Sequence, residues 1–204
     1  MSLSPLEIVF FIVILVMSIV IHEVSHGYAA FIQGDSTAER AGRLTLNPFK
    51  HLDPIGSLIV PIITYLLAGI PFGWAKPVPF NPYNLRSQRW GETIVAAAGP
   101  ASNFLIALVF AAFVHLAPVF SLPSSFITIC ASVVLINIAL GLFNLVPIPP
   151  LDGSKILFGL LPFQYSHPFR RLYERYSLIL LLVFVFFLSY ILNPVISFIF
   201  NHIV

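Results

Sequence analysis

Five consecutive residues combine the side chains that proteins use to bind a metal ion and to move a proton: His22-Glu23-Val24-Ser25-His26. On a helix, residues four positions apart lie on one face, so the His22 and His26 imidazoles can reach one ion. Glu23 projects beside that face, where it can take a proton from a metal-bound water. A buried histidine–glutamate pair that only joins helices is the alternative interpretation. The spacing favours a hydrolytic metal centre.

A catalytic zinc ion normally has three protein ligands and one open position, so a third ligand must come from elsewhere in the chain. Asp152 follows three prolines within the four positions 147–150, which end a helix and leave the backbone extended or kinked. Such backbone is tolerated at membrane depth where it lines a cavity, so it can carry Asp152 to the metal. Alternatively, Asp152 only caps a helix over residues 154–161. Three other candidates lie inside or beside apolar segments: His115, Glu92 and Glu7.

The composition places these residues in a membrane protein. Of the 204 residues, 58% are hydrophobic and 9% are charged, and the mean hydropathy is +0.96. A soluble domain has about 45–50% apolar and about 25% charged residues. A single cysteine excludes a disulfide scaffold, and a net charge of +2 leaves no basic patch for nucleic acid. We therefore expect an all-α polytopic protein embedded in the lipid bilayer.

The apolar segments predict the membrane topology. A spanning helix needs about 20 mainly apolar residues, and four stretches qualify: 8–32, 93–114, 126–148 and 178–200. A fifth stretch, 55–70, has 16 residues with Pro61 in its middle, so we expect a re-entrant or interfacial hairpin there. We also expect small extended strands on the cytoplasmic side. Residues 43–47 alternate polar and apolar side chains and would offer an edge to an extended substrate.

The basic residues predict the orientation. All ten Lys and Arg residues fall within 33–54, 71–92 and 154–177. If the 55–70 segment returns to the side it entered, all ten lie on one membrane face, which the positive-inside tendency makes cytoplasmic. We therefore expect a multi-pass protein of the cell membrane with both termini outside. Its metal site would open toward the cytoplasm.

Three motifs together resemble the site-2 protease family of intramembrane zinc metalloproteases, in its small prokaryotic branch without a PDZ domain. They are H-E-V-S-H-G at 22–27, A-G-P-A-S-N at 98–103 and N-x-x-P-x-P-x-L-D-G at 144–153. The resemblance covers residues 8–161, which we interpret as the core of a single protease domain over 1–204, with 178–200 as a peripheral helix. Asn103, in the second motif, is interpreted as a residue that packs helices together.

The resemblance implies roles for five residues. His22, His26 and Asp152 would bind one Zn²⁺ per chain, Glu23 would be the catalytic base, and Asn144 would steady the tetrahedral intermediate. The implied substrate is a single-span membrane protein, cut within its transmembrane segment.

Two other functions use the same residues without hydrolysis. A membrane zinc carrier or sensor would require further intramembrane His and Asp clusters that form a path, whereas the sequence predicts one cluster reached from one side. A structural membrane protein would bind no zinc and would tolerate Glu23→Gln. We therefore expect peptide hydrolysis.

Overall fold

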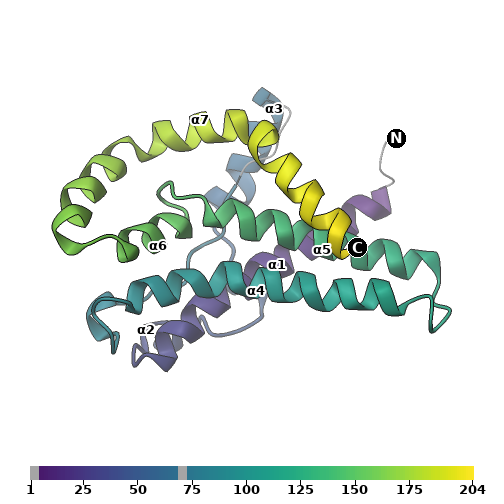
Figure 1. Cartoon of the computed structure of the whole chain (residues 1–204), viewed down its shortest axis with the longest axis horizontal. Helices are drawn as coiled ribbons and strands as arrows, with labels where there is room; N and C mark the ends of the chain where they lie inside the picture. The colour runs from purple at the N-terminus through teal and green to yellow at the C-terminus, as the bar shows by residue number, and fades with distance from the viewer. Residues whose placement is uncertain (1–4, 69–72) are drawn as a thin grey trace.

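The computed structural model describes residues 5–68 and 73–204, and its regular structure there is helical. Three long helices form the body of the protein: α1 (Pro5–Ile32), α4 (Gly91–Leu116) and α5 (Ser124–Leu145). The α4 helix packs along both α5 and α1 (Figure 1). The last helix, α7 (Phe163–Ile203), arcs away from the body and returns to α5 near the C-terminus (Figure 1).

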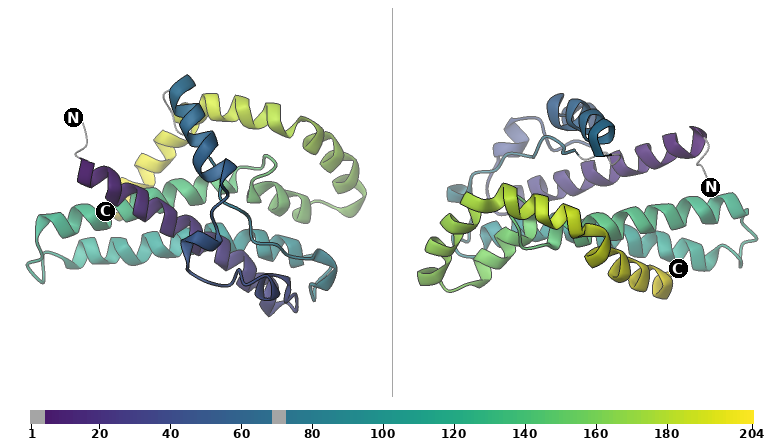
Figure 2. Two further views of the ribbon diagram at one scale, coloured as in Figure 1. Left: turned by 180° about the vertical axis from the view of Figure 1, so that it is seen from behind. Right: turned by 90° about the horizontal axis from the view of Figure 1, so that it is seen from above.

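Shorter helical elements connect the long ones. They are α2 (Thr37–Arg40), η1 (Pro48–Lys50), η2 (Ile55–Ile59), α3 (Val60–Ala68), η3 (Pro82–Asn84) and α6 (Asp152–Leu160). Both 3₁₀ helices begin at a proline after an asparagine, whose side-chain oxygen accepts a backbone N–H of the first turn. The loops that carry α2, η1 and η3 gather at the C-terminal end of α1 (Figure 2).

Three of the predicted spans are present. By length and composition α1, α4 and α5 can each cross a membrane, and they match the predicted stretches 8–32, 93–114 and 126–148. The predicted fourth span, 178–200, lies within α7, which is 41 residues long and begins well before residue 178. The charged residues before position 178 are not part of the apolar run. They still belong to the helix, because Arg and Glu are good helix formers.

The apolar segment after residue 54 forms a short helix. The five residues of η2 and the nine of α3 run on from each other, which gives about 21 Å at 1.5 Å per residue. That length is well below the roughly 30 Å of a bilayer's hydrocarbon core. The α3 helix stands apart from α4 and α5 (Figure 2). Positions 69–70 of the predicted hairpin lie outside the described residues, so re-entry stays a prediction.

The prediction of small cytoplasmic strands is wrong for the described residues, which contain no β-strand. Two features explain the difference. The side chain of Arg43 is buried and donates to the backbone of residues 76 and 77, so residues 43–47 do not form a free edge. Residues 73–81 have no regular secondary structure, and Pro77 and Pro79 lack the N–H groups that a strand ladder needs.

One core cluster pairs small side chains of α4 with β-branched side chains of α5. Ala107 and Ala111 of α4 meet Val134 and Ile138 of α5, and all four are buried. Small residues let two membrane helices approach closely. The end of α7 packs against this cluster through Ile196, Ile199, Phe200, Ile203 and Val204. This contact fixes α4 and α5 relative to each other, and α4 in turn lies against the first helix.

Asp35 connects the end of α1 to the loop that crosses it. Its Oδ1 accepts hydrogen bonds from the Thr37 backbone and hydroxyl and from Asn84 Nδ2, and its Oδ2 accepts the Asn81 N–H at 2.6 Å. Burial alone would raise the pKa of Asp35, but the hydrogen bonds from Thr37, Asn84 and Asn81 outweigh it and hold the pKa below the usual range.

We expect Asp35→Ala to lower the free energy of unfolding by about 1.5–3 kcal/mol at pH 7, because four donors that surround this buried carboxylate lose a charged acceptor. The folded pKa lies below the unfolded value, so this stabilisation is complete above the unfolded pKa of about 4 and is lost as the pH falls through the folded pKa. Thermal unfolding in detergent should therefore show a gap between wild type and variant that narrows below about pH 4. The exposed Glu39→Ala is the control; an equally large effect there would contradict a specific role for Asp35.

Candidate metal centre

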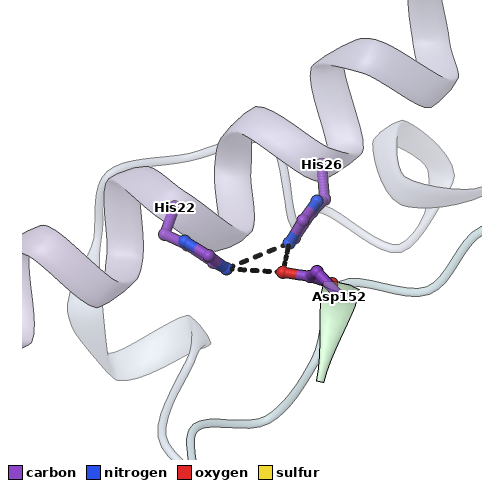
Figure 3. A group of neighbouring side chains, drawn as sticks. All are labelled: His22, His26 and Asp152. Carbon is purple, nitrogen blue, oxygen red and sulfur yellow. Dashed lines mark hydrogen bonds and ion pairs between the residues drawn. The ribbon is translucent and has the colours of Figure 1, made fainter. Parts of the chain in front are cut away.

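The two histidines of the first motif face the interior of the helix bundle. His22 and His26 are 5% and 8% exposed, and their Nε2 atoms lie 3.1 Å apart (Figure 3). The α4 backbone runs directly beside both rings at Gly99. A Cβ atom there would lie 2.5 Å from His26 Nε2 and 2.6 Å from His22 Cε1, so this position requires glycine. The A-G-P motif therefore makes room for the imidazoles.

Asp152 reaches the same point from the first turn of α6 (Figure 3). Its Oδ2 lies 3.1 Å from the Nε2 atoms of both His22 and His26. The turn is positioned by Gly153, because a Cβ there would overlap the Leu145 and Val146 carbonyl oxygens at the end of α5. Asp152 is the first residue of α6 and not its cap, which is Leu151. The alternative that Asp152 only caps this helix is therefore wrong, because its carboxylate faces the histidines.

Hydrogen bonds on the far side of each ring determine which nitrogen carries the proton. His26 Nδ1 lies 2.7 Å from the Val95 carbonyl oxygen, which can only accept, so Nδ1 donates. His22 Nδ1 lies 2.6 Å from Asn103 Oδ1. The amide of Asn103 donates from Nδ2 to Asn137 Oδ1, which identifies Oδ1 as the acceptor facing His22. In the neutral form of each imidazole, Nε2 therefore directs its lone pair at the Asp152 carboxylate.

This donor set fits a zinc ion. The three buried ligand atoms lie within 4.8 Å of one another, and each pairwise distance is 3.1 Å. Zinc with bonds of about 2.0–2.1 Å in tetrahedral geometry separates its ligand atoms by about 3.3 Å. When both imidazoles are neutral, the lone pairs of the two Nε2 atoms and of Asp152 Oδ2 repel each other unless a cation lies among them. Two imidazoles and one carboxylate are a typical catalytic zinc set with one position open.

The predicted base, the predicted oxyanion donor and the other ligand candidates lie outside the cluster of three ligand atoms. Glu23 accepts a hydrogen bond from the Val78 backbone N–H, at 2.9 Å from Oε2. Asn144 is not brought to the cluster by any described contact; its amide donates to the Leu140 carbonyl one turn earlier in α5. Two other ligand candidates have different partners: His115 pairs with the backbone at the end of α7, and Glu92 pairs with Arg170. The third, Glu7, does not belong to the ligand cluster found in the described residues.

Sequence reasoning did not predict the supporting role of Asn103. This residue is fully buried and does join helices, since Asn137, its partner on α5, also donates to Ser18 of α1. In addition it holds the ring of His22, a role that only the fold reveals. The sequence feature that could have indicated this role is a polar side chain within an apolar helix.

We expect Asn103→Leu to weaken zinc binding by about 10- to 100-fold, because the variant no longer fixes the tautomer and orientation of His22. Zinc titration against a competing chelator measures this directly. Ser102→Ala is the matched control on the same helix, because its hydroxyl donates only to the Gly99 carbonyl in the described contacts. Equal zinc affinity in wild type and Asn103→Leu would show that this hydrogen bond does not support the site.

Comparison with known proteins gives the family. The sequence profile of Peptidase family M50 matches residues 120–188, which include Asn144 and Asp152. A Bacillus subtilis protein named "Putative zinc metalloprotease YwhC" is 40% identical over 168 residues, which cover 78% of this chain and 72% of that protein. The chain belongs to the site-2 proteases, peptidase family M50.

More distant relatives of this M50 chain carry similar names. A "Putative zinc metalloprotease Rip2" of Mycolicibacterium smegmatis is 35% identical over 144 residues, 69% of this chain and 53% of that protein. The Mycobacterium tuberculosis protein of the same name is 30% identical over 143 residues, with the same coverage. No solved structure matches the chain. Family membership and the three apolar helices together indicate a zinc metalloprotease embedded in a membrane.

Proposed function

We propose that the protein is an intramembrane zinc endopeptidase that cuts the transmembrane segments of single-span membrane proteins. The observation that carries this proposal is the buried convergence of His22, His26 and Asp152 within apolar helices. His26 and His22 precede the end of α1 by 6 and 10 residues, which is about 9–15 Å along a helix. If the bilayer surface lies at the end of α1, the site would be at a depth where water arrives only through the protein.

His22, His26 and Asp152 would hold one zinc ion per chain. When bound, zinc supplies a Lewis acid that polarises a peptide carbonyl and makes water acidic enough to ionise near neutral pH. The protein fixes the ligands through hydrogen bonds: Asn103 and the Val95 carbonyl hold the two rings. Lys155 Nζ, 3.9 Å from Asp152 Oδ1, offsets charge on the carboxylate oxygen that does not face the histidines.

Glu23 is proposed as the general base and acid. It would accept a proton as a water oxygen attacks the scissile carbonyl carbon, and then deliver that proton to the nitrogen of the departing amine. The Val78 N–H occupies Oε2, so Oε1 is the oxygen proposed to receive the proton. Asn144 would donate to the developing oxyanion after releasing the Leu140 carbonyl.

The substrate class follows from the location of the site. A transmembrane helix bonds its own carbonyls, so a few of its residues must unwind before water can attack. A single-span protein can diffuse to the site within the bilayer. The loops at the C-terminal end of α1 carry Arg40, Arg43, Lys76 and Arg86, which supports a cell-membrane location with this end in the cytoplasm.

Cleavage of a panel of single-span proteins by the purified protein in detergent tests the proposal. We expect wild type to cut at least one of them, a chelator to stop cleavage, and added zinc to restore it. Zinc flux through proteoliposomes without any cleavage would instead identify a carrier. Absence of zinc from well-folded protein would contradict the metal centre itself.

A further inference from the structure

Arg43 is buried without a carboxylate partner among the described residues. Arg43 is only 6% exposed, and its Nε atom is buried with no hydrogen-bond partner among the residues that the structure describes. Burying a guanidinium without a counter-ion is expensive, so such a residue needs a specific use. The contacts that Arg43 makes are with backbone: its Nη2 donates to the Lys76 carbonyl at 2.6 Å and lies 3.4 Å from the Pro77 carbonyl.

The backbone that Arg43 holds leads directly to Glu23. Lys76 is fixed from both sides, because its N–H donates to the His51 carbonyl while its own carbonyl accepts from Arg43. Two residues later the Val78 N–H donates to Glu23 Oε2 at 2.9 Å. Pro77 lies between these two anchors and its ring fixes one backbone dihedral angle, so movement at Lys76 is transmitted to Val78.

The side chain of Val78 fixes the same segment against α1. Val78 is 6% exposed, and its Cγ1 would lie 2.9 Å from a Cβ on Gly27. Gly27 follows Glu23 by four residues and so lies one turn along on the same face. The segment 76–78 is therefore packed on the helix face that carries Glu23, and it donates a hydrogen bond to the Glu23 carboxylate.

We propose that Arg43 is a positioning residue for catalysis: it clamps the backbone of residues 76–78 so that the Val78 N–H holds the Glu23 carboxylate in its working orientation. This inference rests on the proposed role of Glu23. The clamp leaves Oε1 of Glu23 in one place relative to the ligand cluster. Arg43 does not contact the cluster in the described residues, so its loss should change turnover without removing zinc.

The test uses Arg43→Met, which removes the donors and keeps much of the side-chain volume, and Arg43→Lys, which keeps a cationic donor. We expect Arg43→Met to lower kcat by about 10- to 100-fold, as small misplacements of catalytic groups do, with KM and zinc content unchanged. Arg43→Lys should recover part of kcat. It also replaces Arg43→Met as the test variant if Arg43→Met does not fold. Arg40→Met is the matched control, because Arg40 is exposed and donates to Ser36 Oγ.

Amide hydrogen exchange over residues 73–81 provides a readout that does not require proteolysis. The Lys76 and Val78 amides should exchange slowly in wild type and faster in Arg43→Met, while Arg40→Met leaves them unchanged. Three results for Arg43→Met would each overturn the proposal. They are unchanged exchange at the Lys76 and Val78 amides, loss of zinc, and a wild-type kcat despite faster exchange. If wild type cleaves nothing while the exchange pattern is as expected, the proposed function fails and the positioning of Glu23 by the Arg43 contacts stands.

Discussion

Glu23→Gln is expected to lower the rate of peptide cleavage by about 10²- to 10⁴-fold, the usual contribution of a general acid–base residue. The substitution removes proton-accepting capacity but keeps an amide oxygen that can still accept the Val78 N–H. The loop over α1 should therefore stay in place. Zinc content should also remain at the wild-type level, because Glu23 does not belong to the ligand cluster. Initial rates on a cleavable single-span substrate, with zinc counted in each sample, measure both quantities.

The exposed Glu39→Gln is the control for this comparison and should cleave at the wild-type rate. A Glu23→Gln variant that cuts as fast as wild type would show that another group moves the proton. A variant that has lost its zinc would show instead that Glu23 supports the metal site, and the loss of activity could not then be assigned to proton transfer.

Asp152→Ala is expected to have the second large effect, because it removes one of three ligands. Supporting hydrogen bonds to metal ligands are worth about 10- to 100-fold in affinity, so loss of a ligand itself should exceed that range. The purified variant should contain well under one zinc per chain and cleave nothing. Asp152→Asn keeps the shape of a side chain that is buried at 7% exposure, so it separates loss of the charged ligand from loss of packing.

Elemental analysis and chelator competition measure this effect. Asp53→Asn is the matched control, since in the described contacts its carboxylate accepts from Trp74 Nε1 rather than from the histidines. Full zinc occupancy in both Asp152 variants would contradict the proposed ligand set. Another carboxylate or histidine would then have to complete the site.

The long apolar helices were predictable because residues next to each end in the sequence determine where the helix stops. The α5 helix ends at Leu145 because proline follows at 147, and α1 ends where the apolar run reaches Gln33. The histidine pair was predictable for the same reason, since four residues of spacing on a helix place both rings on one face.

Other features depend on contacts between distant parts of the chain. Asp152 was a candidate by chemistry, but 130 residues separate it from His22, and only the approach of α6 to α1 selects it over other acids. The alternation at 43–47 was interpreted as a strand edge, yet the buried Arg43 side chain donates to a loop more than 30 residues away. Asn103 and Gly99 support the histidines across the α1–α4 interface, which no local pattern predicts.

The most direct test of the central claim is to map the cut in a single-span substrate, reconstituted with the protein in liposomes, in water enriched in oxygen-18. Mass spectrometry of the products should show a cut within the apolar segment. One heavy oxygen should appear in the new carboxyl group, and Glu23→Gln should give no such product. A zinc-loaded wild type that leaves every substrate intact, or cuts only outside the apolar segment, would contradict an intramembrane endopeptidase.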